Sequence, residues 1–246
     1  MLKYLSRLAP LKFLRLAEAS GHIFHPTDIG LFLQGSRIDA KIEKLRKSVG
    51  DHAAFNAIYQ EYNDPWASVS TKYRYQQRKY EVIISLLPPS QRFHSALDLG
   101  CGLGDLSRRL AERSETVLGL DVANSAIEQA RAMHGNVAGM SFDQCDILDI
   151  PNRLDQMFDL VTIADSIYYI SPMSDDLLKK IASRVSRLLT PGGVCLLANH
   201  YFFGTDRDSK LSRRIHHAFH WSDGFLHVSD HWRPFYLVSV LTVPEA

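Results

Sequence analysis

The chain has 246 residues, 46% of them hydrophobic, which is enough to bury the core of one large domain or of a domain with an extension. Its 28 basic residues balance 27 acidic ones, so no broad electrostatic field attracts nucleic acid or an anionic membrane. No apolar run approaches the ~18 residues of a membrane span, and the three cysteines form no CxxC pair, so we expect a cytoplasmic protein with reduced thiols and no zinc ribbon.

Residues 1–89 are predicted to form a helical N-terminal extension. Basic residues and Pro10 interrupt the first 20 residues, so we expect no continuous signal-peptide segment there. A basic amphipathic helix in that stretch would pack on the protein or a partner or, as the alternative, lie on a membrane surface. Apolar residues recur at helical spacing over 39–49 and 70–87, and residues 63–66 predict a turn between these helices.

Residues 90–246 alternate short apolar runs with amphipathic ones. The runs predict strands at 95–100, 116–121, 140–147, 158–165, 194–202, 224–232 and 236–243. Helices are expected at 105–114, 123–134 and 174–189, and a turn at 190–193. Strands that alternate with helices predict a parallel sheet, whereas the last two strands predict an antiparallel pair at its edge. The predicted fold class is therefore α/β, with a doubly wound, mostly parallel, seven-stranded sheet.

The segment LDLGCGLGD, residues 97–105, joins the first strand of this domain to its first helix. Ligands of open α/β sheets bind at that point, where glycine lets them approach the backbone and the helix offers free N–H groups. A P-loop would require Gly-Lys-Ser/Thr, and a dinucleotide motif would require a glycine where Asp105 stands. Asp98 and Asp105 favour a cationic ligand instead, such as the sulfonium and ammonium groups of S-adenosylmethionine.

This pattern resembles the cofactor-binding motif of class I S-adenosylmethionine-dependent methyltransferases, and the resemblance extends over residues ~90–200. It implies that Asp121, at the end of the second strand, accepts the ribose hydroxyls. It also implies that Asp146 contacts the adenine and that Ile147 packs on the ring. The segment LLTPGGVCLL matches the family motif before the fifth strand. The cofactor-binding residues predicted in this domain are Asp98, Gly100, Cys101, Gly102, Asp121, Val122, Asp146, Ile147, Ala164 and Asp165.

The segment NDPWASVSTKYRYQQRKYEVIISLLP, which precedes the first strand, resembles the NodS-type family. Members of that family N-methylate the amino sugar of a nodulation oligosaccharide. The resemblance implies that this segment covers the cofactor like a lid. It further implies that Trp66 and Tyr73 wall the site and that Arg78 binds the cofactor carboxylate.

Methyl transfer requires an aligned acceptor and a group that takes its proton. His200 ends the fifth strand on the ligand side and is the candidate base, while Tyr168 and Tyr169 are candidates for the acceptor pocket. A small-molecule amine is the favoured acceptor. O-methylation of a sugar or natural product and a non-catalytic cofactor-binding subunit remain as alternatives.

Other ligands are disfavoured. His216 and His220 lie one helical turn apart, but the sequence places no clear acidic or cysteine partner beside them, so we predict no metal. The histidine-rich C-terminal segment is expected to line an acceptor cleft or to be a solvated helix face. The chain also lacks the proline pair with which adenine methyltransferases of DNA hold a flipped base after the fourth strand.

Overall fold

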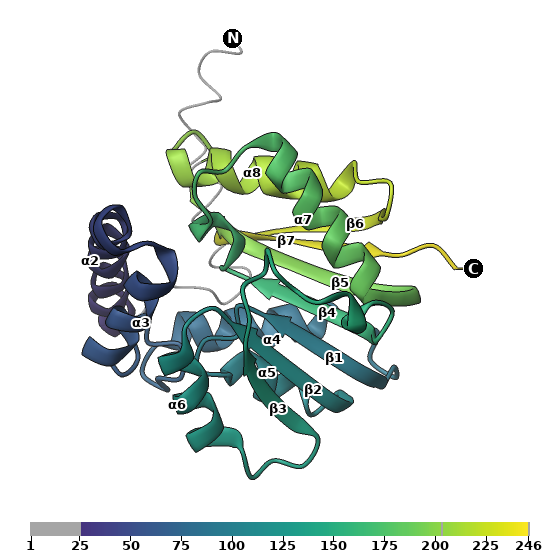
Figure 1. The fold of residues 1–246 in the computed structure, drawn as a ribbon, viewed down its shortest axis with the longest axis horizontal. Helices are drawn as coiled ribbons and strands as arrows, with labels where there is room; N and C mark the ends of the chain where they lie inside the picture. The colour runs from purple at the N-terminus through teal and green to yellow at the C-terminus, as the bar shows by residue number, and fades with distance from the viewer. Residues whose placement is uncertain (1–25, 203, 246) are drawn as a thin grey trace.

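The computed structural model describes residues 26–202 and 204–245, so the helix expected within residues 1–20 lies outside the described part. The seven strands form one sheet, as predicted, and their order in it is β3-β2-β1-β4-β5-β7-β6 (Figure 1). Strands β1 to β5 run parallel, and β7 runs antiparallel to both of its neighbours. The strands are β1 Phe93–Leu99, β2 Ser114–Asp121, β3 Met140–Gln144, β4 Phe158–Ala164, β5 Leu189–Tyr201, β6 Leu226–Arg233 and β7 Phe235–Thr242.

Seven helices surround this sheet in the described part of the chain. They are α2 Pro26–Val49, α3 Asp51–Glu61, α4 Arg74–Ser85, α5 Asp105–Leu110, α6 Asn124–His134, α7 Asp175–Leu188 and α8 Arg207–His220. Two short 3₁₀ turns lie at Asn152–Leu154 and Ile167–Tyr169. Local chemistry fixes several boundaries; for example, the Ser174 hydroxyl accepts a hydrogen bond from the Leu177 N–H and caps α7. None of the described helices is long and apolar enough to cross a membrane.

Helices cover both faces of the sheet, which explains why the central strands are almost continuously apolar. Leu97 and Leu99 of β1 belong to the core cluster that β1, β4 and β5 form with α7 and α8. Ala96 points to the other face, where α4 and α5 pack. Alternation along each strand therefore assigns every side chain to one of two layers.

The predicted turn at 190–193 lies inside β5 rather than before it, which corrects the expected strand boundary. Phe158 of β4 pairs with Leu189, but Leu160 already pairs with Val194. The intervening residues leave the β4 ladder. They bond instead to the C-terminal segment, where the Val243 N–H donates to the Gly193 carbonyl at 3.0 Å. Gly192, at φ 74°, permits this detour.

Helices α2 and α3 lie at the carboxyl ends of the parallel strands, not on a face of the sheet (Figure 1). Their apolar side chains form a cluster with Leu103, after the glycine-rich turn, and with Ala123 and Ala126 of the β2–α6 region. The Asn56 side chain of α3 accepts a hydrogen bond from the Ser125 N–H at 3.0 Å. The two helices thus cover the edge at which the sequence predicts the ligand site.

Candidate cofactor and acceptor site

Side chains from two other parts of the chain pack against the glycine-rich turn between β1 and α5, namely Ser166 after β4 and Tyr59 of α3. Gly100 and Gly102 have φ values of 75° and 52°, a region that side chains disfavour. A Cβ on Gly100 would lie 2.3 Å from the Ser166 Cβ, and one on Gly102 would lie 2.8 Å from the Tyr59 hydroxyl oxygen. The chain's own packing therefore requires glycine at both positions.

Asp98 lies beneath the turn and is fully buried. Its two carboxylate oxygens accept hydrogen bonds from the Ser107 and Thr162 hydroxyls, at 2.7 and 2.8 Å. Burial raises the pKa of Asp98 to about 6, although these hydrogen bonds oppose the shift. The predicted cofactor-side acid is thus enclosed in the protein, and its hydrogen bond with Ser107 connects it to α5.

Asp121 ends β2 beside the same turn. Its oxygens accept hydrogen bonds from the backbone N–H groups of Gly102 and Ala123, both at 2.9 Å. Burial raises the pKa of Asp121, and the backbone hydrogen bonds counteract that effect. Because a carboxylate has about four lone-pair positions, Asp121 keeps acceptor capacity for two hydroxyl groups.

Asp146 follows β3 and faces α3. His52 Nε2 lies 2.7 Å from Asp146 Oδ2, and the Leu148 N–H donates to Oδ1. Ile147 is half-buried and packs against the α7–α8 side of the core. Val122 is half-buried in the α2–α3 cluster, and Cys101 is buried beside Phe142 of β3.

These residues fit S-adenosylmethionine. Three features lie at one edge of the sheet: the glycine-rich turn with positive φ angles, Asp121 after β2 and Asp146 after β3. Asp121 has spare acceptor capacity for the ribose hydroxyls, and Asp146 follows on the next strand, on the side expected for the adenine. The cofactor would supply an electrophilic methyl group on its sulfonium. Asp121, Asp146 and the turn are the residues that would hold it.

Arg78 does not point into the site. Its guanidinium pairs with Glu81 at 2.9 Å and is half exposed, so the structure does not bring it to the other predicted residues. The adjacent Lys79 points inward: it is fully buried and forms an ion pair with Asp165. Tyr73 is buried beside Tyr75, with ring centroids 6.0 Å apart.

Asp165 and His200 meet where β4 and β5 end. His200 Nε2 lies 3.7 Å from Asp165 Oδ1, too far for a hydrogen bond. Among the described residues, neither Asp165 Oδ1 nor His200 Nδ1 has a hydrogen-bond partner. Asp165 follows Ala164 with φ 54°, an uncommon value for a residue with a side chain.

Protonation states follow from these surroundings. Burial lowers the pKa of His200; Asp165 acts to raise that pKa, and Lys79 acts to lower it. The imidazole is therefore neutral at neutral pH. Burial would raise the pKa of Asp165, but the charge that His200 carries once protonated, together with the charge and hydrogen bond of Lys79, outweighs it; the pKa falls and the carboxylate is ionised.

Aromatic side chains surround this pair. The His200 ring lies 5.5 Å from the Tyr168 ring and stacks on Phe202 at 5.6 Å, measured between centroids. Tyr169 lies 4.5 Å from Tyr168 and donates its hydroxyl to Asp39 Oδ1 of α2 at 2.7 Å. Trp66 donates its indole N–H to the same oxygen at 2.9 Å.

Three of these groups were missed by reasoning from the sequence: Lys79, Asp39 and Tyr59. For Lys79 a signal exists, because Tyr75, Lys79, Val82 and Ile83 form the buried stripe of α4 and Arg78 lies outside it. For Asp39 and Tyr59 no local pattern marks the residue, since each meets its partners only when α2 and α3 dock.

The fold and this edge define a class I S-adenosylmethionine-dependent methyltransferase. The profile of a family described as a methyltransferase domain matches residues 93–227, and the chain belongs to that family. Nodulation protein S of Rhizobium tropici is 25% identical over 154 residues, which cover 63% of this chain and 60% of that protein. Nodulation protein S of Bradyrhizobium diazoefficiens is 28% identical over 156 residues, covering 63% and 69%.

Among solved structures, the N-methyltransferase NodS from Bradyrhizobium japonicum in complex with S-adenosylhomocysteine superimposes with a TM-score of 0.64. That alignment covers 77% of this chain and 97% of NodS, at 18% identity, and it shows a shared fold. The match to the Rhizobium tropici protein spans about three fifths of that protein's length. The resemblances predicted from the sequence are confirmed at the level of fold, family and cofactor.

Proposed function

We propose that the protein methylates an amine of a small molecule, such as an amino sugar or a secondary metabolite. The observation that carries this proposal is the unpaired, buried Oδ1 of Asp165 beside His200. A buried polar atom without a partner costs about 1–3 kcal/mol, and an N–H group of a bound amine would remove that cost.

The charge around this position supports an amine over a hydroxyl. Two carboxylates, Asp165 and Asp39, act on His200 electrostatically, whereas the ammonium of Lys79 pairs with Asp165 alone. Burial raises the pKa of Asp39 although the hydrogen bonds of Trp66 and Tyr169 oppose it, so a nearby cation would stabilise the ionised form. Tyrosine, tryptophan and phenylalanine faces favour cations further.

His200 is proposed as the base. A protonated amine must lose a proton before its nitrogen has a lone pair for attack. Neutral His200 can take that proton at Nε2, which lies 3.7 Å from the Asp165 Oδ1 at which the amine is proposed to bind. The ionised Asp165 then stabilises the imidazolium, and Lys79 holds Asp165 in place.

We further infer that α2 and α3 are a lid over the cofactor. Tyr59 covers Gly102, His52 binds Asp146, and Asn56 binds Ser125, so one helix spans the predicted methionine, adenine and ribose positions. Helix α4 differs, because its buried face is part of the sheet packing. The predicted division of the chain at residue 89 stays a prediction.

The acceptor class can be tested with labelled S-adenosylmethionine and paired acceptors that differ only by an amine or a hydroxyl, including amino sugars. We expect label on the amines and little on the matched alcohols. Asp39→Asn keeps an oxygen for Trp66 and Tyr169 but removes a charge. It should lower kcat/KM for a cationic amine about tenfold, without changing affinity for S-adenosylhomocysteine. Equal labelling of both partners of a pair would contradict the proposal.

A further inference from the structure

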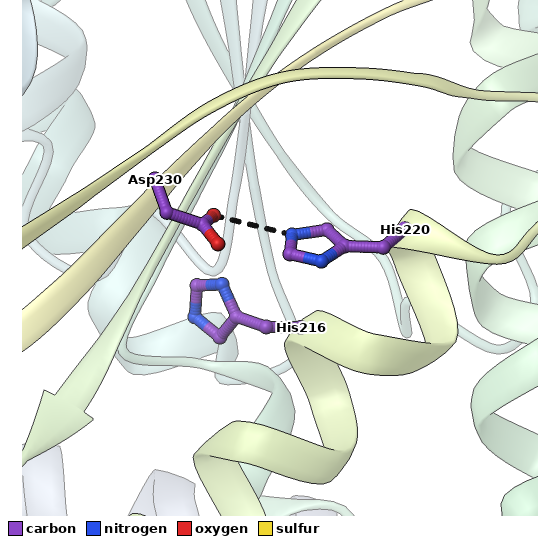
Figure 2. A group of neighbouring side chains, drawn as sticks. All are labelled: His216, His220 and Asp230. Carbon is purple, nitrogen blue, oxygen red and sulfur yellow. Dashed lines mark ion pairs between the residues drawn. The ribbon is translucent and has the colours of Figure 1, made fainter.

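A second group of metal-ligating side chains lies where α8 meets the antiparallel strands β6 and β7. Figure 2 shows the imidazoles of His216 and His220, one turn apart on α8, turned toward the Asp230 carboxylate of β6. The acid that the sequence did not locate is thus supplied by a neighbouring strand. His216 is buried, so this segment is not simply a solvated helix face.

The group is separate from the methyltransfer site. Ser239 of β7 pairs with Asp230 on one side and with Leu197 of β5 on the other. Leu197 faces the core formed with α7 and α8, whereas Ala198 faces α4. The histidines therefore lie on the opposite face of the sheet from Lys79, and they do not line the acceptor cleft.

We propose that this group is a binding site for a divalent transition metal such as zinc, with His216, His220 and Asp230 as ligands. The three ligand atoms all lie within 4.8 Å of one another. Zinc–nitrogen bonds of about 2.0–2.1 Å place the ligand atoms of a tetrahedral site about 3.3 Å apart. His220 Nε2 and Asp230 Oδ1 are already 3.2 Å apart.

His227 would be the fourth ligand after a side-chain rotation, because it stands outside the three-residue group whose ligand atoms all lie within 4.8 Å of one another. Its Nε2 lies 3.1 Å from Asp230 Oδ1, and its ring lies 4.2 Å from that of His220. A shift in the β6–β7 register between His227 and Ser229 marks a bulge in β6. Three imidazoles and one carboxylate would complete a tetrahedral set of nitrogen and oxygen atoms, both of which are accepted zinc ligands.

Ser239 marks the centre of the group. Its Oγ lies 2.6 Å from His216 Nδ1, 2.9 Å from His220 Nε2 and 2.5 Å from Asp230 Oδ1. Three ligand atoms therefore converge on one point, which is what an ion requires. A bound ion would lie beside that point, displaced away from the Ser239 Cβ, with the three side chains moved toward it and the hydroxyl turned to another rotamer.

The side chains are also in the protonation states that bind metals, namely neutral imidazole and ionised carboxylate. Burial lowers the pKa of His216 to about 3 and also lowers that of His220. Burial would raise the pKa of Asp230, but hydrogen bonds from Ser239 and His227 outweigh it, so the pKa falls. The ion would hold α8 against β6 and β7 and stabilise this end of the sheet.

The test is a zinc titration of the untagged, chelator-treated full chain against a chromophoric chelator. We expect one equivalent of zinc to bind, and His220→Ala to weaken its affinity by at least about 30-fold. His217→Ala is the matched control, because His217 is exposed on the same helix, and it should change the affinity less than twofold. Wild-type affinity no tighter than that of His220→Ala, or an equal loss in His217→Ala, would overturn the proposal.

Further measurements distinguish a lost zinc ligand from a loss of folding in the His220→Ala variant. Ser239→Ala removes the competing hydroxyl, so zinc affinity should hold or increase; a loss as large as that of His220→Ala would overturn the proposed geometry. Cobalt in the site should give the intense visible absorption of tetrahedral coordination, and weak octahedral bands would exclude the tetrahedral set. Affinity for S-adenosylhomocysteine should stay unchanged in His220→Ala, which separates this site from the methyltransferase function.

Discussion

The two halves of the sheet's carboxyl edge hold their polar groups in different ways. On the β2 side, Asp121 is fixed by backbone N–H groups of Gly102 and Ala123, close to it at the strand ends. On the β4–β5 side, Asp165 is held by Lys79, 86 residues away in the chain, and Tyr169 binds Asp39, 130 residues away. The position of Asp121 thus depends on its own strand end and the adjoining turn, whereas the contacts of Asp165 and Tyr169 depend on the docking of α4 and α2.

The largest effect expected from this difference is on catalysis. His200→Ala should lower kcat by about 10²–10⁴-fold, the range for loss of a positioned base, and should leave affinity for S-adenosylhomocysteine unchanged. Because burial lowers the pKa of His200, its neutral form persists to more acidic pH. The acid limb of the pH–rate profile should therefore lie below the usual histidine value of about 6.5.

A pH–rate profile of the wild type beside the variant measures this. His94→Ala is the control, since that side chain is 80% exposed at the start of β1. If His200→Ala keeps the same acid limb as the wild type, another group is the base.

The next prediction compares the contributions of the adjacent residues Lys79 and Arg78 to the free energy of unfolding. Lys79→Met should destabilise the fold by about 3–5 kcal/mol, because it leaves the Asp165 carboxylate buried without its partner. Arg78→Met removes an exposed pair with Glu81 and should cost at most about 1 kcal/mol. Urea unfolding measures both, and similar losses of unfolding free energy would refute the inward role of Lys79.

On the backbone-held side a smaller loss is expected. Asp121→Ala should weaken S-adenosylhomocysteine by about 1–3 kcal/mol, through the lost charge-assisted hydrogen bonds to the ribose. Asp121→Asn keeps one oxygen for the backbone N–H groups and should lose less. Isothermal calorimetry compares the three proteins, and wild-type affinity in Asp121→Ala would show that the ribose lies elsewhere.

The smallest effect concerns the lid. His52→Ala removes the contact to Asp146, but His52 is 53% exposed, so the loss in cofactor affinity should stay below about 1 kcal/mol. The loss should shrink further at high salt, because exposed charges are screened. Calorimetry at two salt concentrations checks this, with His94→Ala again as the control. A loss larger than that of Asp121→Ala would make α3 a principal cofactor-binding element.

Local patterns were sufficient to predict the sheet, its antiparallel edge pair and the edge at which ligands bind. Six strands end within one residue of the predicted end, whereas β3 ends at Gln144, three residues before the predicted end at 147. Parallel strands bring their carboxyl ends together at one edge of the sheet. The glycine-rich turn, Asp121 and Asp146 are each adjacent to a strand end, so their positions follow from the strand prediction alone. The turn predicted at 190–193 was misplaced because β5 continues through it, supported by the C-terminal segment.

The sequence by itself therefore determined the family, the cofactor and the residues at the strand ends. The motifs that identify them are each confined to one strand and its adjoining loop, so they can be recognised without knowledge of the packing. The tertiary structure decided that Lys79, which lies in the buried stripe of α4, pairs with Asp165, because that contact depends on how α4 packs on the sheet. It also decided the positions of Asp39, Tyr59 and His52, which meet their partners only across docked elements. The same holds for Asp230, whose place beside His216 and His220 depends on strand register and a bulge, and no local pattern encodes register between distant segments.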